Sequence, residues 1–259
     1  MKGKCAIVTG STSGIGLGIA EALAHAGVNV MLNGLGDAQE IEKTRAALET
    51  ATGVKVRYHG ADMTKPDEIA DMVDVSEREL GAVDIIVNNA GIQHTSPVET
   101  FPTDRWDAII AINLTSAFHM TRLALPKMRA NGWGRVINIA SVHGLVGSVH
   151  KAAYVAAKHG VVGLTKVVAL ECAETQITVN AICPGWVRTA LVEKQIDALA
   201  HANNISKDEA AVKLLEEKQP SKKFVEVEQL GALAVFLCSD AASAMTGMSI
   251  PVDGAWTAR

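Results

Sequence analysis

The segment Cys5-Ala-Ile-Val-Thr-Gly10-Ser-Thr-Ser-Gly14-Ile-Gly16 decides the fold of this chain. Residues 5–9 form a short apolar run rich in β-branched side chains, typical of a strand buried on both faces of a parallel sheet. The glycines open an apolar-periodic segment that predicts a helix to about Ala26. Such a turn lets a pyrophosphate rest on the helix N-terminus, where free N–H groups favour anions. The spacing differs from G-x-G-x-x-G, and a plain strand-to-helix turn is the alternative.

Strand-like and helix-like segments alternate along the rest of the chain. Short apolar runs predict further strands near residues 28–32, 54–58, 83–87, 135–140, 177–182 and 249–252. This alternation predicts a Rossmann-type α/β fold, a doubly wound parallel sheet of seven strands with helices on both faces. We find no linker or repeat and expect a single domain over residues 1–259. The charge-rich, helical stretch at about 187–219 is either a solvated helical hairpin or a lid over the ligand site.

The composition argues against several classes of function. The 24 basic and 28 acidic residues give a net charge of −4 without a dense basic tract, so nucleic acid is not an expected partner. No apolar run approaches the roughly 20 residues of a membrane span, and the first residues do not read as a signal peptide. The four cysteines are scattered, which favours reduced thiols over a disulfide framework or a metal site. We expect a cytoplasmic protein without a membrane partner or a bound metal.

Polar residues follow the predicted strands at their carboxyl ends, the edge at which open α/β sheets bind ligands. In dinucleotide-binding folds an acidic side chain at the tip of the second strand selects NAD, and an arginine nearby selects NADP. In this chain neither residue type stands at that tip. The lack of a basic partner favours NAD. Asp37 comes later and is more readily an N-cap of the next helix than a ribose ligand. Asp62, after the third strand, either bonds an adenine amino group or caps the helix near Pro66.

Amide residues mark two further places. The fourth strand runs into Asn88-Asn89-Ala90-Gly91, which either leaves room for a flat cofactor or forms a structural turn. Asn113 stands inside a predicted helix from about Thr103 to Ala130, although asparagine is a mediocre helix former. It indicates either a local kink or a residue with a hydrogen-bonding function.

The chemistry is expected at Ser141, Tyr154 and Lys158. Ser141 ends the fifth strand, and Tyr154 and Lys158 share one face of an alanine-rich helix because they are four residues apart. A neighbouring ammonium favours phenolate and lowers the pKa of a tyrosine from its ordinary value near ~10. Tyr154 could then exchange a proton with an alcohol or carbonyl oxygen to which Ser141 donates a hydrogen bond. Taken alone, an ordinary surface pair explains the tyrosine and lysine at least as well.

Together these motifs resemble the short-chain dehydrogenase/reductase superfamily over nearly the whole chain. The motifs are Thr9-Gly10-x-x-x-Gly14-x-Gly16, Asn88-Asn89-Ala90-Gly91, Asn113, Ser141, Tyr154-x-x-x-Lys158 and Pro184-Gly185. The resemblance implies that Tyr154 is the general acid/base, and that Lys158 lowers its pKa and binds the nicotinamide ribose. It also implies that Ser141 polarises the substrate oxygen, and that Asn113 helps to hold a water in a proton relay.

The same resemblance implies a homotetramer and a bound nicotinamide dinucleotide. The residues implied to contact the dinucleotide are Gly10, Thr12, Ser13, Gly14, Ile15, Gly16, Leu35, Asp62, Met63, Asn89, Ala90, Gly91, Tyr154, Lys158, Pro184, Gly185, Val187 and Thr189.

Further segments are similar to the bacterial D-3-hydroxybutyrate dehydrogenases within that family. The segments lie at 33–37, 92–97, 141–146, 150–151, 185–189, 192–195 and 219–223. They imply a clamp for a small hydroxy acid at Gln93, Ser141, His143, Lys151, Tyr154, Trp186, Gln195 and Trp256. The implied reaction is reversible, NAD-dependent oxidation of (R)-3-hydroxybutyrate to acetoacetate. The alternatives are another reductase of the family, such as a 3-oxoacyl reductase, or a cofactor-binding sensor without turnover. Ala190 follows Thr189 at a position where the resemblance implies proline. This difference bears on the stiffness of the residues that lead into the predicted lid, and not on the chemistry.

Overall fold

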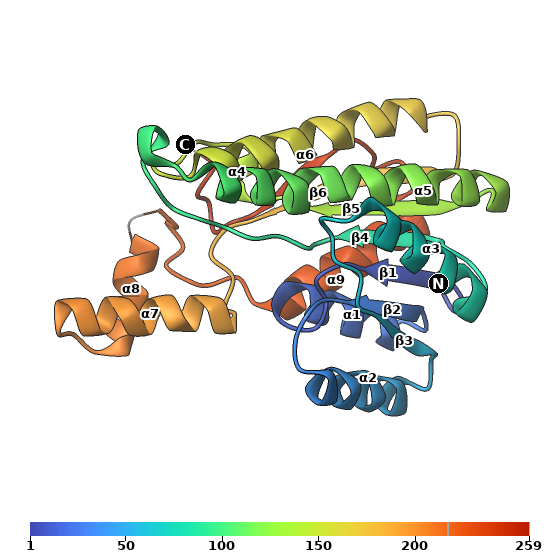
Figure 1. The fold of residues 1–259 in the computed structure, drawn as a ribbon, viewed down its shortest axis with the longest axis horizontal. Coiled ribbons are helices and arrows are strands. Elements are labelled where there is room, and N and C mark those ends of the chain that lie inside the picture. Colours follow the sequence, from blue (N-terminus) through green and yellow to red (C-terminus); the bar gives the residue numbers. More distant parts are fainter. Residues whose placement is uncertain (217, 259) are drawn as a thin grey trace.

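A seven-stranded parallel sheet forms the centre of the computed structural model, which describes residues 1–216 and 218–258 (Figure 1). The strands are β1 (Cys5–Val8), β2 (Asn29–Asn33), β3 (Val56–His59), β4 (Ile85–Asn88), β5 (Gly134–Ile139), β6 (Ile177–Pro184) and β7 (Ser249–Val252). Their order is β3-β2-β1-β4-β5-β6-β7, so the direction of winding reverses between β1 and β4. Open α/β sheets bind ligands at such a reversal. The predicted α/β fold is confirmed.

Helices cover both faces of the sheet (Figure 1). On one face lie α1 (Gly14–His25), α2 (Ala38–Thr52) and α9 (Val227–Cys238). On the other lie α3 (Pro66–Leu80), α5 (Ser116–Asn131) and α6 (Ala152–Glu171). Successive side chains of β1 point to opposite faces. Ala6 and Val8 therefore pack in the first apolar core, and Cys5 and Ile7 in the second. This two-sided burial explains why the strands are apolar without a polar alternation.

The predicted helix over residues 103–130 is interrupted. It consists of α4 (Thr103–Ile110), a π-helical turn (Ala111–Thr115) and α5. The π turn contains Asn113, whose side chain is occupied by hydrogen bonds to the backbone of Ile92. Single π turns occur frequently at functional sites, because the extra residue re-aims a side chain. Both readings of Asn113, the kink and the hydrogen-bonding function, therefore hold.

Two helical segments, Thr103–Asn131 and Ala152–Glu171, are long and apolar enough to cross a membrane. Both pack against this sheet: α5 contacts β4 and β5, and α6 contacts β6. Helices that form the core of a globular protein have this length and composition too, so the two segments are weak evidence for a membrane. All four cysteines are free thiols and buried, as expected from their spacing.

A helical hairpin stands apart from the sheet, formed by α7 (Ala190–Asn203) and α8 (Lys207–Glu216) (Figure 1). It has a small apolar cluster of its own, which includes Val192, Ile196 and Ala210, with Trp186 and Phe224 packed against it. The charge-rich stretch predicted at about 187–219 thus contains two helices, and residue 217 lies outside the described residues. The Thr189 hydroxyl accepts a hydrogen bond from the N–H of Val192 and caps α7 at 3.4 Å.

Candidate active site

A cavity of about 680 Å³ opens at the carboxyl ends of β1, β4, β5 and β6. Every residue that the sequence predicted for the substrate lines it, namely Gln93, Ser141, His143, Lys151, Tyr154, Trp186, Gln195 and Trp256. Most of the predicted cofactor residues line it too, namely Gly10, Ser13, Gly14, Ile15, Asn89, Ala90, Gly91, Tyr154, Lys158, Pro184, Gly185, Val187 and Thr189. Positions more than two hundred residues apart in the chain therefore meet in one site.

The glycine loop forms the floor of one end of this cavity. A Cβ at Gly16 would lie only 2.3 Å from the carbonyl oxygen of Gly10, so the loop has no room for a side chain there. Gly10 and Gly14 have φ angles of 61° and 57°, a region that favours glycine. Asn89 fixes the loop, since its Nδ2 donates to the carbonyls of Thr9 and Gly10, both at 2.9 Å. Asn89 is thus both a structural clamp and part of the cavity wall.

The N-terminus of α1 fits a phosphate group. Ser13, Gly14 and Ile15 line the cavity at the first turn, and the side chain of Ser13 makes no cap hydrogen bond. The N–H groups of a first helical turn have no intrahelical acceptors, and the helix dipole adds positive potential at this end. The chain's own backbone can therefore hold the pyrophosphate of a dinucleotide.

Several predicted cofactor residues do not line the cavity, namely Thr12, Gly16, Leu35, Asp62 and Met63. Met63 is buried in the apolar core, and Leu35 is 71% exposed. The Oδ1 atom of Asp62 accepts hydrogen bonds from the backbone and hydroxyl of Thr64, at 2.9 and 2.8 Å. The reading of Asp62 as the cap of the helix near Pro66 is wrong, because the N-cap of α3 is Lys65 and Asp62 bonds Thr64 in the turn before it. Asp37 is the N-cap of α2, as the sequence indicated.

Tyr154 and Lys158 lie one helical turn apart in α6, and both face the cavity. The Lys158 ammonium lies 5.6 Å from the centre of the Tyr154 ring and donates to the Ile139 carbonyl at 2.7 Å. Ser141 follows the end of β5 by two residues, lies beside them and hydrogen-bonds the Tyr154 hydroxyl. The structure thus brings together the hydroxyl, phenol and ammonium that the sequence predicted.

The pKa values at this site differ from the sequence expectation. Burial raises the pKa of Tyr154 above its ordinary value of 10.0, and the hydrogen bond from Ser141 opposes this only in part. The lowering of the Tyr154 pKa that the sequence predicted from Lys158 is not observed. Burial also lowers the pKa of Lys158 itself, to about 8. Burial penalises the charged form of each group, and the two groups share one enclosed space. The protein alone therefore keeps the phenol protonated at neutral pH.

Asn113 lies behind the cavity wall and does not line the cavity. Its Oδ1 accepts from the N–H of Ile92 at 2.9 Å, and its Nδ2 donates to the Ile92 carbonyl at 3.0 Å. Because Ile92 lies between Gly91 and Gln93, this pair of hydrogen bonds sets the backbone that carries Gln93 into the site.

Replacing Asn113 with alanine should leave both backbone groups of Ile92 without these partners. We expect the free energy of unfolding to fall by about 1–3 kcal/mol, because the hydrogen bonds are shielded from solvent. Urea denaturation gives this value from the midpoint at constant slope. An unchanged midpoint would show that water replaces the amide without loss.

The other end of the cavity is aromatic and cationic. The His143 ring lies edge-to-face on Trp256 and Tyr154, with ring centres 5.5 and 6.2 Å apart. Its Nε2 is 3.4 Å from the Nζ of Lys151. Burial, followed by the charges of Lys151 and Lys218, lowers the pKa of His143 to about 4. His143 is therefore neutral at pH 7 and accepts a hydrogen bond from Lys151 through Nε2.

Sequence reasoning missed part of the cavity wall. The missed residues are Ile92, Ile139, Ala140, Val142, Ala190 and Val192. They are mostly apolar and carry no motif of their own. The sequence indicates them only through their position, because each lies within three residues of a predicted site residue. Among the described residues, no cluster of histidine, cysteine and carboxylate side chains could hold a metal ion.

Comparison with known proteins gives one consistent result. Residues 4–200 match the family model for short chain dehydrogenases. The chain belongs to the short-chain dehydrogenase family. It is 58% identical to a D-beta-hydroxybutyrate dehydrogenase of Cupriavidus necator, over 100% of both chains. It is 52% identical to a D-beta-hydroxybutyrate dehydrogenase of Rhizobium meliloti, over 99% of both chains.

Solved structures agree with this family assignment. The crystal structure of levodione reductase superposes with a TM-score of 0.91 at 33% identity, covering 100% of this chain and 99% of that one. This short-chain dehydrogenase is therefore an oxidoreductase, and its cofactor is a nicotinamide dinucleotide. The glycine loop and the free first turn of α1 are the parts of the site that suit such a cofactor.

Proposed function

We propose that this short-chain dehydrogenase oxidises (R)-3-hydroxybutyrate reversibly to acetoacetate with NAD⁺. The observation that carries the proposal is the arrangement of Lys151, His143 and Gln93 around the same cavity as Tyr154. A small hydroxy acid needs cationic and amide donors for its carboxylate beside a proton-transfer group for its hydroxyl. The names of the two relatives above describe the same substrate.

In the proposed reaction the phenolate form of Tyr154 accepts the proton of the substrate hydroxyl as general base, and the phenol returns this proton in the reverse direction. The Ser141 hydroxyl donates a hydrogen bond to the same oxygen and holds it in place. Lys158 keeps its ammonium beside the Tyr154 ring, where a positive charge favours the phenolate that accepts this proton, against the effect of burial. A nicotinamide held beside Tyr154 and Lys158 would supply the hydride acceptor for the carbon that carries the hydroxyl. Lys158 also serves to hold the ribose of this cofactor.

The remaining residues serve binding. For the dinucleotide, the first turn of α1 and the loops after β4 and β6 form the cradle. For the substrate, Gln93, His143, Lys151 and Gln195 bind the carboxylate, while Trp186 and Trp256 offer apolar surface to its methyl group. Helices α7 and α8 serve as a lid on a single dinucleotide-binding domain, because lid closure over such a site excludes water.

Replacing Lys151 with alanine should mainly weaken substrate binding. The loss of a charge-assisted hydrogen bond costs about 1.5–3 kcal/mol, which corresponds to a KM about 10- to 100-fold higher with little change in kcat. Steady-state kinetics with (R)-3-hydroxybutyrate measure both constants. An unchanged KM would show that Lys151 does not bind the carboxylate.

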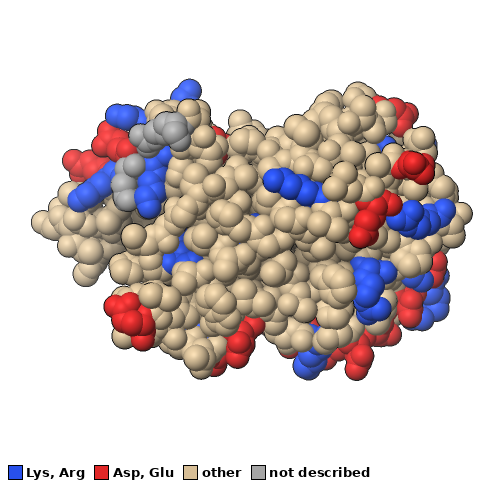
Figure 2. Space-filling view, turned by 90° about the horizontal axis from the view of Figure 1, so that it is seen from above, with Lys and Arg blue, Asp and Glu red and all other residues tan. Residues whose placement is uncertain are grey.

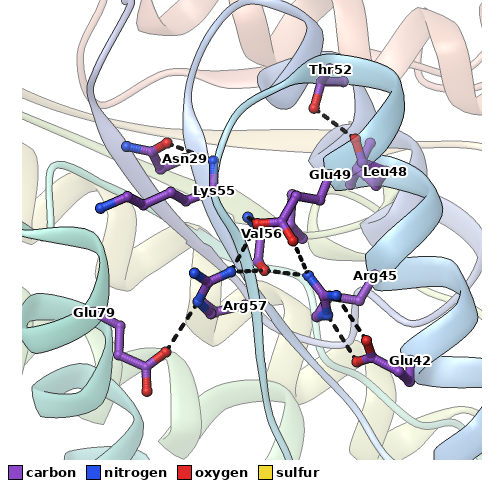
Figure 3. A network of polar contacts seen from close by, with 10 residues as sticks. All are labelled: Asn29, Glu42, Arg45, Leu48, Glu49, Thr52, Lys55, Val56, Arg57 and Glu79. Carbon is purple, nitrogen blue, oxygen red and sulfur yellow. Dashed lines mark hydrogen bonds and ion pairs between the residues drawn. The ribbon is translucent and has the colours of Figure 1, made fainter.

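The preference for NAD over NADP rests on the surroundings of the β2 tip. Residues 33–36 contain no basic side chain. Figure 3 shows where the nearest arginine in sequence points: Arg45 is bonded to Glu42 and Glu49, and it donates to the Val56 carbonyl at 2.9 Å. Val56 begins β3, so Arg45 lies toward the amino edge of the sheet, away from the cavity. It is poorly placed to bind a 2′-phosphate.

An arginine at the β2 tip should therefore relax the cofactor preference. The variant Leu35→Arg places a cation on an exposed side chain, and we expect kcat/KM with NADP⁺ to rise about three- to tenfold. Leu35→Gln is the matched control without a charge. Equal values for the two variants would show that the ribose end of the cofactor lies elsewhere.

We also propose a cytoplasmic homotetramer. The exposed apolar side chains of α5 and α6 support an assembly, because Phe118, Val167 and Leu170 are 46%, 54% and 78% exposed. Figure 2 looks onto the side of the molecule where α6 lies, and charged side chains are sparse over its middle. Exposed apolar side chains gathered on one face are a feature of protein interfaces.

The proposed function is tested in the reducing direction. Purified protein with NADH should convert acetoacetate to 3-hydroxybutyrate, and chiral chromatography should find only the R product. Formation of the S product would contradict the proposed geometry. Turnover only of 3-oxoacyl thioesters with NADPH would favour the alternative function within the family.

A further inference from the structure

The segment at residues 219–223 is one of those that resemble the D-3-hydroxybutyrate dehydrogenases, but the proposed reaction gives it no role. Gln219 begins this segment, three residues after the end of α8, and its backbone N–H donates to the Leu215 carbonyl at 2.7 Å. The residue is 0% exposed, although glutamine is mostly found on protein surfaces. A buried amide costs free energy unless its polar atoms are bonded, so the contacts of Gln219 indicate its role.

Both polar atoms of the Gln219 amide bond to backbone groups. The Oε1 atom accepts a hydrogen bond from the N–H of Trp186 at 2.9 Å, and the Nε2 atom donates to the Lys223 carbonyl. The carbonyl of Trp186 accepts from the N–H of Val225 at 2.8 Å. The chain that returns from the proposed lid therefore holds the backbone of Trp186 at both of its polar groups. Of these two contacts with Trp186, only the one from Gln219 is made by a side chain.

The Trp186 ring is not held by a hydrogen bond of its own. Its Nε1 is buried, and none of the described residues accepts a hydrogen bond from it. The ring packs against the apolar cluster of the lid and against Trp256, with the two ring centres 6.3 Å apart. Because apolar contacts are not directional, the place of the ring depends on the backbone that carries it. Gln219 holds that backbone.

Gln219 lies between the two turns that carry the tryptophans. A Cβ at Gly185, the residue before Trp186, would lie 2.5 Å from the Gln219 Oε1. A Cβ at Gly254, in the turn that leads to Trp256, would lie 2.8 Å from the Gln219 Cγ. Neither glycine has room for a side chain on the side of Gln219. The glutamine therefore fills the space behind a wall of the cavity to which both tryptophans belong.

We propose that Gln219 is a positioning residue for Trp186 and sets the length of the hydroxy acid that the pocket accepts. This inference rests on the proposed function, in which Trp186 offers its surface to the methyl group of the substrate. A hydrophobic pocket discriminates one methylene by about 10- to 200-fold. Such discrimination requires a wall that does not yield to the longer chain. Without the amide of Gln219, the Trp186 ring can shift and admit the extra methylene.

A merely structural role of Gln219 makes a different prediction. The loss of buried hydrogen bonds would then lower the stability and the amount of active protein. Turnover of every substrate would fall by the same factor. The ratio of kcat/KM for two substrates does not depend on the amount of active protein, because both values contain the same enzyme concentration. This ratio therefore reports on the pocket even in a destabilised variant.

The test measures kcat/KM for (R)-3-hydroxybutyrate and for (R)-3-hydroxypentanoate, which is longer by one methylene. Gln219→Met keeps the length of the side chain and removes both hydrogen bonds. Gln219→Asn keeps an amide but shortens the side chain by one methylene. Gln229→Met is the matched control, because the Gln229 Oε1 also accepts a backbone N–H, that of Glu226 at 3.0 Å, at an exposed position of α9.

We expect the wild type to prefer the shorter acid by at least about tenfold, and both Gln219 variants to reduce this preference about three- to tenfold. Gln229→Met should keep the preference of the wild type. In a Trp186→Ala background, Gln219→Met should change the preference by less than about twofold, because the effects of two residues that act together are not additive.

Three results would overturn the role of Gln219 and leave the proposed function intact. These are a wild type without a preference for the shorter acid, an unchanged preference in both Gln219 variants, and a full effect of Gln219→Met in the Trp186→Ala background. A wild-type protein that is inactive with (R)-3-hydroxybutyrate would instead overturn the proposed function, and the role of Gln219 with it.

Discussion

Replacing Tyr154 with phenylalanine is expected to lower kcat for hydroxybutyrate oxidation by about 10³-fold, the range that general acid–base groups contribute. The substitution removes one oxygen and keeps the ring that packs edge-to-face on His143. The substrate's hydroxyl then has no protein group to take its proton, since Ser141 can only donate or share a hydrogen bond. We expect KM and thermal stability to change little.

The chain offers a matched control for this substitution. It contains only two tyrosines. The other, Tyr58, donates its hydroxyl to the Gly34 carbonyl at 2.8 Å, outside the catalytic cavity. Tyr58→Phe should retain kcat within about twofold. Its free energy of unfolding should fall by about 1 kcal/mol, the contribution of one hydrogen bond. Near-normal turnover in Tyr154→Phe would contradict the assignment of the general base.

Replacing Lys158 with methionine is expected to reduce activity and stabilise the fold at the same time. Lys158 is 4% exposed, and burial lowers its pKa from the ordinary 10.5 to about 8. A shift of this size means that burying the charge costs on the order of 3 kcal/mol at neutral pH. The lost hydrogen bond to Ile139 offsets part of the gain, which leaves about 1 kcal/mol. Functional sites often carry such a cost in stability.

The gain in stability should depend on pH in a defined direction. Below pH 8 the lysine is charged in both the folded and the unfolded chain, so the burial cost is fully present. Between pH 8 and 10.5 only the unfolded chain stays charged, and the wild type becomes more stable as pH rises. Lys158→Met should therefore unfold about 2 °C above wild type at pH 7 and lose this advantage toward pH 10.

Measurements of activity distinguish the catalytic role of Lys158 from its effect on stability. We expect kcat/KM of Lys158→Met to fall by at least about 10²-fold, because the phenolate that acts as the base loses its neighbouring charge. Lys166→Met, on an exposed position of the same helix, serves as control and should change neither activity nor stability. A variant that is destabilised at pH 7 would contradict the cost assigned to the buried ammonium.

The parts of the site that sequence reasoning located share a physical origin. Parallel strands bring their carboxyl ends to one edge, so Gly10, Asn89, Ser141 and Gly185 had to converge once the strands were recognised. The helical spacing of four then fixed Tyr154 and Lys158 on one face. These conclusions follow from periodicity and topology, which are readable along the chain.

Other features depend on packing that no local pattern encodes. The π turn around Asn113 occurs where Ile92, a residue from another segment, bonds both polar atoms of the Asn113 amide. The raised pKa of Tyr154 comes from burial, which the sequence shows only after the fold is known.

The most direct test of the central claim is the initial rate of NADH formation with purified protein, NAD⁺ and each enantiomer of 3-hydroxybutyrate in separate reactions, repeated with NADP⁺. The proposed site predicts turnover of the R enantiomer with NAD⁺, and rates with the S enantiomer or with NADP⁺ lower by at least about tenfold. Equal rates with both enantiomers, or no turnover by a protein that still binds NADH, would contradict it.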